Sequence, residues 1–186
     1  MLNLYETLLS DQNEEDNDIY LNILNDMHGH LDFNDMCKYH DLTAYDKLSE
    51  TDSHQLNILH LNSLSLSNKI DSIASIFQTL KRSPDILCVT ETWLQEPSKD
   101  LCSLGGFRAF HLCRTTRSHG GVSVFVANNL QVDQVENLTF ITNEIEINTV
   151  KVNIGDSSYT ICTIYRPDNK YTNIDSFTNK LSDIIS

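Results

Sequence analysis

The chain of 186 residues is long enough for one domain with a substantial core. Its 40% hydrophobic and 21% charged residues are ordinary for a soluble globular protein, and no stretch reaches the ~18 apolar residues that a membrane-spanning helix needs. The net charge of −13 would disfavour nucleic acid if it were evenly spread, but residues 1–54 hold 13 acidic against 2 basic residues. Residues 55–186 hold 13 against 11, so polyanion binding by this part is not excluded.

Residues 1–54 are predicted to form an acidic, largely disordered leader, with residues 11–18 as its most polar run. The chain begins without a basic segment followed by a long apolar one, so no secretory signal is expected. Its five cysteines include no CxxC pair, which favours a reducing compartment. We therefore expect an intracellular protein, cytoplasmic or nuclear and not secreted, whose folded domain covers residues 55–186.

A strand, a helix and a second strand are predicted at the start of that domain. Residues 56–61 predict a strand with its apolar side chains in the core, and it runs into Asn62. Apolar residues at three- and four-residue steps predict a helix near residues 67–82, with Ser67 as its N-cap. The nearly all-apolar residues 86–89 predict a buried parallel strand. This order predicts a βαβ unit, whose two strand ends share one sheet edge.

Further strands and a second helix are predicted downstream. Residues 96–106 have the composition of a loop, and Gly120-Gly121 is typical of a turn between strands. Two alternating stretches around Gly155-Asp156 predict a hairpin. The predicted strands and helix cover residues 107–113, 122–126, 145–154, 159–164 and 173–185.

Polar side chains follow both strands of the βαβ unit. Glu91 directly follows the second strand, where a carboxylate is costly unless a cation or a donor meets it. Mg²⁺ is commonly held by one or two carboxylates together with water and substrate phosphate. Asn62 takes the equivalent place after the first strand, where an amide can hold metal-bound water or a phosphate oxygen. Taken singly, an exposed strand-end glutamate and a turn asparagine are the commoner interpretations.

Basic and aromatic residues at other strand ends suit a phosphodiester. Tyr165-Arg166 combines a phenolic hydroxyl with a guanidinium, which binds phosphate in a bidentate manner. Arg114 and Arg117 lie beside the glycine turn and are candidates for contacts with a nucleic-acid backbone. Each of these signals is weak alone, because strand-end aromatics more often pack and turn arginines are more often only solvated.

The order and spacing of these motifs resemble the endonuclease/exonuclease/phosphatase superfamily. More narrowly, they resemble the apurinic-type endonuclease domain that opens the second open reading frame of non-LTR (LINE-like, jockey-type) retrotransposons. The resemblance extends from about residue 37 to the C-terminus. The residues that carry it are Ile58-Leu59-His60-Leu61-Asn62, Pro84-Asp85-Ile86, Thr90-Glu91-Thr92-Trp93-Leu94, Gly106-Phe107, Arg114, Arg117, Gly120-Gly121-Val122 and Ile164-Tyr165-Arg166-Pro167.

The resemblance implies an α/β fold, the four-layer sandwich of DNase I-like proteins with two facing sheets. It also implies nicking of DNA for target-primed reverse transcription, in which water attacks in line and Mg²⁺ stabilises the developing charge. Asn62 and Glu91 are implied at the metal, with Glu91 as its ligand, and Tyr165 is implied to place the scissile phosphate. We expect the Asn62 and Glu91 side chains to lie roughly 4–7 Å apart, as Mg²⁺–oxygen bonds of ~2.1 Å require.

The same resemblance gives the expected partners. Arg114, Arg117 and Arg166 are the candidate substrate-binding residues, and the DNA phosphate backbone is the expected partner. No membrane partner is expected.

The chain also departs from the family pattern. An arginine is usual where Ser63-Leu64-Ser65 stands, and a third glycine is common where His119 stands. The later Gly-Asp-Phe-Asn and terminal Ser-Asp-His motifs, which supply the water-activating aspartate and a phosphate-site histidine, do not occur in the sequence. We therefore expect a partial sandwich with about one βαβ-containing sheet, its second half missing. Self-association through the uncovered sheet is expected to follow.

Three functional interpretations remain open at this stage. The first is a fragment of a Mg²⁺-dependent retrotransposon endonuclease that is inactive by itself. The second is a decayed or domesticated, non-enzymatic piece with at most a nucleic-acid or protein-binding role. A remoter third is another branch of the superfamily that acts on phosphoesters such as inositol phosphates.

Overall fold

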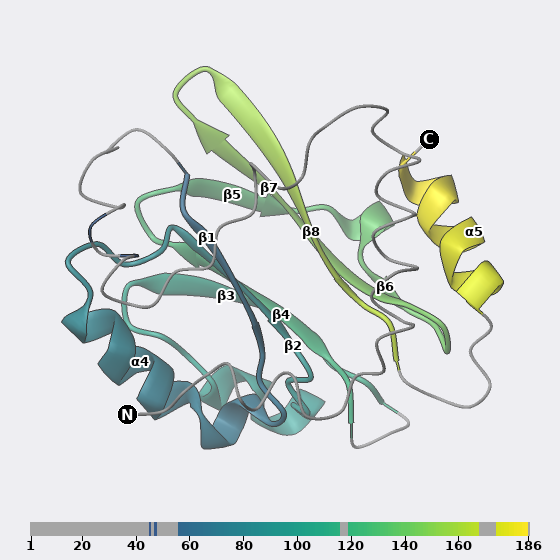
Figure 1. The fold of residues 1–186 in the computed structure, drawn as a ribbon, viewed down its shortest axis with the longest axis horizontal. Coiled ribbons are helices and arrows are strands. Elements are labelled where there is room, and N and C mark those ends of the chain that lie inside the picture. The colour runs from purple at the N-terminus through teal and green to yellow at the C-terminus, as the bar shows by residue number, and fades with distance from the viewer. Residues whose placement is uncertain (1–44, 46, 48–55, 116–118, 168–173, 186) are drawn as a thin grey trace. The chain divides into compact units, whose positions relative to one another are not determined.

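The computed structural model describes Tyr45, Lys47 and residues 56–115, 119–167 and 174–185. The chain divides into two units, Met1–Asp41 and Leu42–Ser186, and every described residue belongs to the second unit. Apart from Tyr45 and Lys47, the expected acidic leader lies outside the described residues, as does Arg117. Figure 1 shows the path of the chain.

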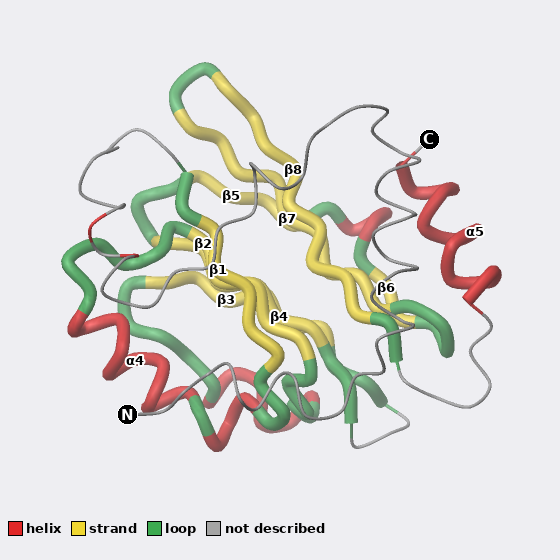
Figure 2. Tube along the Cα trace, in the orientation of Figure 1, coloured by secondary structure: helices red, strands yellow, loops and turns green. Residues whose placement is uncertain are grey.

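The described part of the second unit contains two four-stranded sheets, coloured yellow in Figure 2. The first sheet has the order β1 (Ile58–Asn62), β2 (Ile86–Thr90), β4 (Val122–Ala127) and β3 (Phe107–Leu112). In the second sheet, β7 (Glu146–Ile154) pairs with β5 (Gln131–Gln134), β6 (Phe140–Ile141) and β8 (Ser157–Tyr165). The helices that cover the sheets are α4 (Ile70–Thr79) and α5 (Ile174–Ile185).

The predicted strand–helix–strand unit is confirmed. Strands β1 and β2 pair in parallel, with Asn62 opposite Thr90, and α4 lies between them in the chain. Ser67 is not the N-cap, because a 3₁₀ turn over Leu66–Asn68 precedes the helix and Lys69 takes the capping position without a side-chain bond. The strand ends nevertheless reach one edge of the sheet, as the βαβ pattern requires.

Helix α4 covers the outer face of the first sheet. Its Ile73 and Phe77 belong to one buried cluster with Leu87, Val89 and Phe125 of the sheet. This contact explains the helical spacing of apolar residues in α4, since only one of its faces is removed from water. Figure 1 shows α4 lying against this sheet.

The inner faces of the two sheets form a second buried cluster. It draws on alternate residues of facing strands, namely Ile86, Cys88, Val124, Val126, Val132, Val150 and Val152. The opposite side chains of β7 pack with α5, where Phe177 contacts the cluster of Ile145 and Ile147. Strand β7 therefore reads as nearly continuously buried because it is covered on both faces.

The layers run in the order α4, first sheet, second sheet and α5, which confirms the α/β sandwich. The second sheet, which we expected to be missing, is present. It is built by β5 to β8, and β7 presses its apolar residues against β4. The inner face of the first sheet is therefore covered, and the expected self-association through an uncovered sheet loses its basis.

Three local predictions from the sequence need correction. Ile58 and Leu59 were expected in the core but are 48% and 38% exposed, because β1 is an edge strand. The loop expected at residues 96–106 begins with a 3₁₀ helix over Glu96–Leu101, and β5 and β6 were not predicted.

Among the described helices, none has the length and apolar character needed to cross a membrane.

Candidate metal and phosphate site

Glu91 and Asn62 come from neighbouring strand ends. Glu91 directly follows β2, whose last residue Thr90 is paired with Asn62 of β1. The amide oxygen of Asn62 accepts a long hydrogen bond of 3.4 Å from the backbone N–H of Leu64. Both candidates therefore lie at the same sheet edge, and the separation of their side chains stays a prediction.

The Glu91 carboxylate accepts one side-chain hydrogen bond on each oxygen. The Tyr165 hydroxyl donates to Oε1, and the indole N–H of Trp93 donates to Oε2 at 2.7 Å. Tyr165 is the last residue of β8 in the second sheet and stands 74 positions after Glu91. The candidate site is therefore shared by both sheets, and one of its hydrogen bonds joins them.

The backbone around Glu91 is held in an unusual conformation. Glu91 and Trp93 have φ values of 55° and 54°, in the left-handed region that side chains other than glycine rarely adopt. Backbone bonds to the glycine turn hold this loop, from Thr92 N–H to Gly121 O at 3.2 Å and from Trp93 N–H to Gly120 O at 2.8 Å. Such strained positions cluster at functional sites, where surrounding contacts hold them in place.

The two glycines of the turn are required by space as well as by conformation. Gly120 and Gly121 have φ values of 90° and 86°. A Cβ atom on Gly120 would lie 2.5 Å from the Glu146 carboxylate, and one on Gly121 would lie 2.5 Å from the Thr92 hydroxyl. Both positions must therefore lack a side chain, Gly121 so that the turn approaches the Glu91 loop and Gly120 so that it approaches Glu146.

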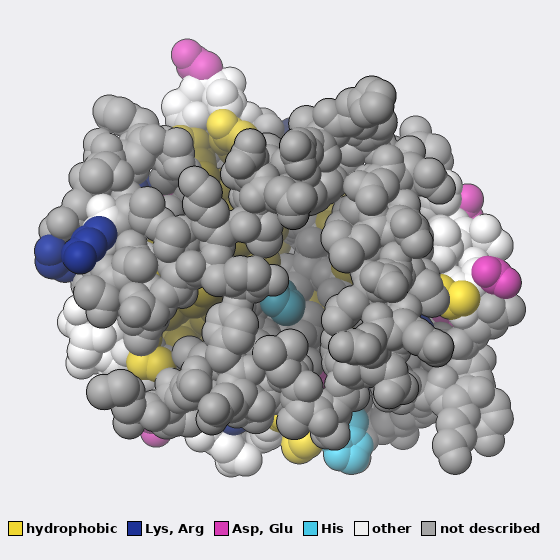
Figure 3. All heavy atoms as spheres, in the orientation of Figure 1, with side chains coloured by type: hydrophobic (Ala, Val, Ile, Leu, Met, Phe, Trp, Pro, Cys, Tyr) yellow, Lys and Arg dark blue, Asp and Glu magenta, His cyan; other side chains and the backbone are white. Residues whose placement is uncertain are grey.

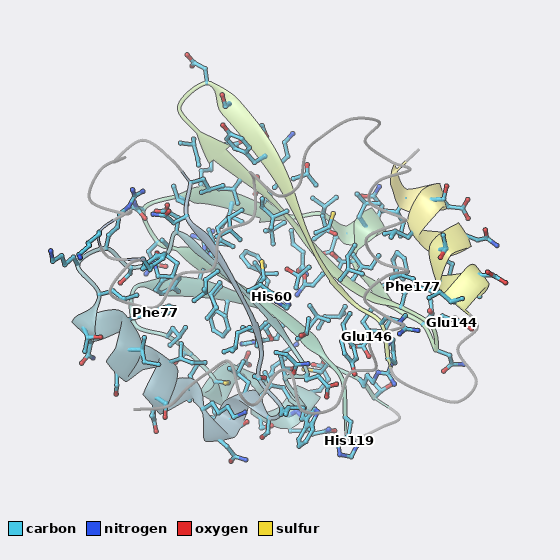
Figure 4. The ribbon with its side chains drawn as sticks, viewed as in Figure 1. His60, Phe77, His119, Glu144, Glu146 and Phe177 are labelled. Atoms are coloured by element: carbon cyan, nitrogen blue, oxygen red, sulfur yellow. The ribbon has the colours of Figure 1, made fainter. Side chains whose placement is uncertain are left out.

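A buried ion pair supports this turn from the second sheet. Glu146 is fully buried at the start of β7 and accepts the Nε–H of Arg114, which is 7% exposed. The other Glu146 oxygen accepts the Gly121 N–H at 2.6 Å. Burial raises the pKa of the Glu146 carboxyl, while the Arg114 charge and the Gly121 N–H act in the opposite direction. Figure 4 shows Glu146 inside the unit, between the two sheets.

This ion pair corrects the expectation for Arg114. We expected Arg114 at the surface, in contact with a DNA backbone, but its guanidinium is buried and neutralises Glu146. A buried carboxylate without a cation would be very costly, which explains the inward position. Sequence reasoning missed Glu146, because its local pattern does not record that Arg114, 32 positions earlier, meets it.

Tyr165 is held as a hydrogen-bond donor. Burial, and then the bond to the Glu91 carboxylate, raise the pKa of its phenol above the ordinary value of 10.0. The hydroxyl therefore stays protonated throughout the physiological range. Arg166 follows it directly and is half-buried, whereas Arg117 lies outside the described residues.

The oxygen atoms available as ligands at this edge of the sheet suit a hard cation. Glu91 keeps lone pairs on both oxygens beyond those used by Tyr165 and Trp93, and Asn62 offers an amide oxygen. Mg²⁺ favours such oxygen ligands and takes few of them from the protein. Within the described ranges, no three His, Cys, Asp or Glu side chains come together as a metal-binding group. Any metal here would therefore rest on Glu91 and Asn62, with water and phosphate completing its shell.

The two-sheet α/β sandwich is the fold of a nuclease-like domain of the endonuclease/exonuclease/phosphatase kind. Residues 54–169 match the endonuclease/exonuclease/phosphatase family, and the chain belongs to this family. The comparison with curated proteins finds no match.

Solved structures with a similar fold include DNA-processing enzymes. An AP endonuclease from Leishmania major matches with a TM-score of 0.53 and 15% identity, over 73% of this chain and 47% of that one. The APE2 catalytic domain of Xenopus laevis matches with a TM-score of 0.46 and 14% identity, over 69% and 51%. Truncated TDP2 of Caenorhabditis elegans matches with a TM-score of 0.48 and 15% identity, over 70% and 56%. The chain thus spans about half the length of these structures, and the first of them shows the shared fold.

Proposed function

We propose that this chain is part of a Mg²⁺-dependent DNA endonuclease of the non-LTR retrotransposon kind, which hydrolyses a phosphodiester bond to nick DNA. The observation that carries the proposal is the Glu91 carboxylate at the end of a parallel strand, held by Tyr165 from the facing sheet. The motif order described above favours the retrotransposon branch over phosphatases of the same superfamily.

The chemistry of each residue at the site indicates its role. Glu91 and Asn62 would hold Mg²⁺, which supplies charge stabilisation at the attacked phosphate when bound. Tyr165 remains a neutral donor and orients the Glu91 carboxylate. Arg166, next to Tyr165, offers a guanidinium suited to a phosphate oxygen. The buried Arg114–Glu146 pair supports the turn behind Glu91 and is not assigned to DNA.

Among the residues assigned to this site, Glu91 and Asn62 are metal ligands and Arg166 contacts phosphate, but none is a base that activates water. General-base assistance is typically worth ~10²–10⁴-fold in rate. We therefore expect the 186-residue chain, assayed by itself, to nick DNA no faster than background.

The test has two parts, beginning with the reading frame beyond the codon for Ser186. We expect in-frame Gly-Asp-Phe-Asn and Ser-Asp-His motifs there, and we expect the longer product to nick supercoiled plasmid in the presence of Mg²⁺. The Glu91→Ala variant of that product should lose the nicking, whereas Asp156→Ala, at the far hairpin turn, should keep it.

Two results would count against the proposal. A reading frame without those motifs would favour the decayed or domesticated, non-enzymatic interpretation. Nicking that survives Glu91→Ala would remove Glu91 from the metal site.

A further inference from the structure

Trp93 contacts the same carboxylate as Tyr165. Its indole N–H donates to Glu91 Oε2 at 2.7 Å, while Tyr165 occupies Oε1. The backbone N–H of Trp93 donates to Gly120 O at 2.8 Å. The residue is therefore fixed to the glycine turn through its backbone and to Glu91 through its side chain.

The indole ring also contacts a second aromatic ring. His119 meets it edge-on, with ring centroids 4.5 Å apart and an interplanar angle of 90°. Figure 4 places His119 at the lower rim of the view, where Figure 3 shows a histidine side chain at the surface. Edge-to-face contacts of this kind are favourable and restrict rotation of the indole ring.

These contacts limit the freedom of Glu91. A glutamate side chain has three torsions. If only one carboxylate oxygen accepts a hydrogen bond, the carboxylate group can still rotate about that hydrogen bond. A second donor on the other oxygen fixes the plane of the carboxylate and leaves the remaining lone pairs in set directions. Groups that hydrogen-bond to a metal ligand typically change metal affinity 10–100-fold when they are removed.

We propose that Trp93 is a positioning residue, whose indole N–H holds the Glu91 carboxylate in the orientation that binds a divalent cation, and that His119 holds the indole ring in place. This inference rests on the proposed function, because it concerns the same metal site. It goes further in one respect: metal binding should require the indole N–H of Trp93, and an aromatic ring of the same shape without that N–H should not replace it.

Trp93 is the single tryptophan of the chain, which makes a direct measurement possible. The full chain labelled with ¹⁵N should give one indole N–H cross-peak in a ¹H–¹⁵N correlation spectrum. Glu91→Gln should move this cross-peak upfield, because an amide oxygen accepts a hydrogen bond more weakly than a carboxylate. Adding MgCl₂ should shift the wild-type cross-peak in a saturable way.

Metal affinity is measured separately with Mn²⁺, which prefers the same oxygen ligands and can be counted by its free EPR signal. Trp93→Phe should weaken Mn²⁺ binding about 10–100-fold. Replacing Trp93 with benzothienylalanine, which keeps the bicyclic ring but has sulfur in place of N–H, should weaken it equally. His119→Gly should weaken binding less, and His119→Phe, which keeps the ring contact, should restore it.

The outcomes separate this inference from the proposed function. Wild-type Mn²⁺ affinity in the benzothienylalanine variant would overturn the positioning role while leaving the metal site intact. A wild-type chain that binds no Mn²⁺ would overturn the metal site, and the positioning role with it. The dispersion of the backbone amide spectrum shows whether each variant is folded, and the benzothienylalanine variant decides the matter if Trp93→Phe does not fold.

Discussion

Tyr165 shows how a single residue acquires a chemical state from its surroundings. Its phenol is partly buried and its proton lies toward a carboxylate, and both effects disfavour the phenolate. In the unfolded chain, the same phenol has an ordinary pKa near 10. The native state therefore holds this proton more tightly than the unfolded state does.

Stability should depend on pH above 10 for this reason. The contribution of Tyr165 is fully present below the unfolded pKa and is lost as pH rises from there through the raised folded pKa. The free energy of unfolding in urea should thus fall more steeply with pH in the wild type than in Tyr165→Phe. Equal slopes for the two proteins between pH 10 and 11 would contradict the assignment.

The sequence was informative for some site residues and silent on others. Glu91, Asn62 and Tyr165 could be selected because each ends an apolar strand pattern, and the structure joins Glu91 to Tyr165. Glu146 could not be selected, because its burial depends on Arg114, 32 positions away. Pairing of this kind is a property of the folded chain, since no local periodicity records which charge meets which.

At the scale of elements, the Gly120-Gly121 turn connects the two sheets. It accepts backbone donors from the Glu91 loop and donates the Gly121 N–H to Glu146 of β7. A Cβ atom at Gly121 would meet Thr92, whereas one at Gly155, in the hairpin between β7 and β8, meets nothing within 4 Å. The two positions have φ values of 86° and 57°, so both carry a backbone penalty.

This contrast gives a matched pair of substitutions. Gly155→Ala should cost only the left-handed backbone term, roughly 1–2 kcal/mol. Gly121→Ala should cost that and the displacement of Thr92, and it should also broaden the indole signal of Trp93. Urea unfolding measures the first effect and the correlation spectrum the second. Equal losses of stability at the two glycines would mean that the turn is not a close contact.

Elements with a strong period were predictable and short ones were not. Helix α5 begins within one residue of the predicted start, because its apolar face repeats over three turns. Strands β5 and β6 have four and two residues, and their strand conformation depends on pairing with β7. The nearly continuous burial of β7 depends on the first sheet and α5, which cover its two faces, and neither contact is recorded in the local sequence.

At the scale of the whole chain, the charge is divided very unevenly. Residues 1–54 carry a net −11, whereas residues 55–186 carry −2. The family match begins at residue 54, close to this change of composition. The uneven charge matters for any polyanionic partner. The acidic residues 1–54 repel such a partner, which lowers its rate of encounter with the chain and its affinity.

A chain that begins at Gln55 should therefore bind duplex DNA more tightly than the full sequence at low salt. The difference should shrink as salt rises, because the Debye length falls from ~30 Å at 0.01 M to about 8 Å at 0.15 M. Fluorescence anisotropy with a labelled duplex measures both affinities. A full-length chain in which the acidic residues of 1–54 are changed to Asn and Gln controls for the loss of length. No difference between the full and shortened chains at low salt would contradict this prediction.

Glu91 comes from the first sheet and Tyr165 from the second, so the hydrogen bond between them depends on the thickness of the apolar layer between the sheets. Valines such as Val124 and Val150 set how far apart the two strand ends stand, because the side chains of this layer are closely packed. A larger side chain there would separate the partners without touching either of them. Substitutions in this layer are thus limited by the spacing that they set between the sheets as well as by their hydrophobicity. A variant with a slightly wider core could be just as stable and still lose the alignment of Glu91 with Tyr165.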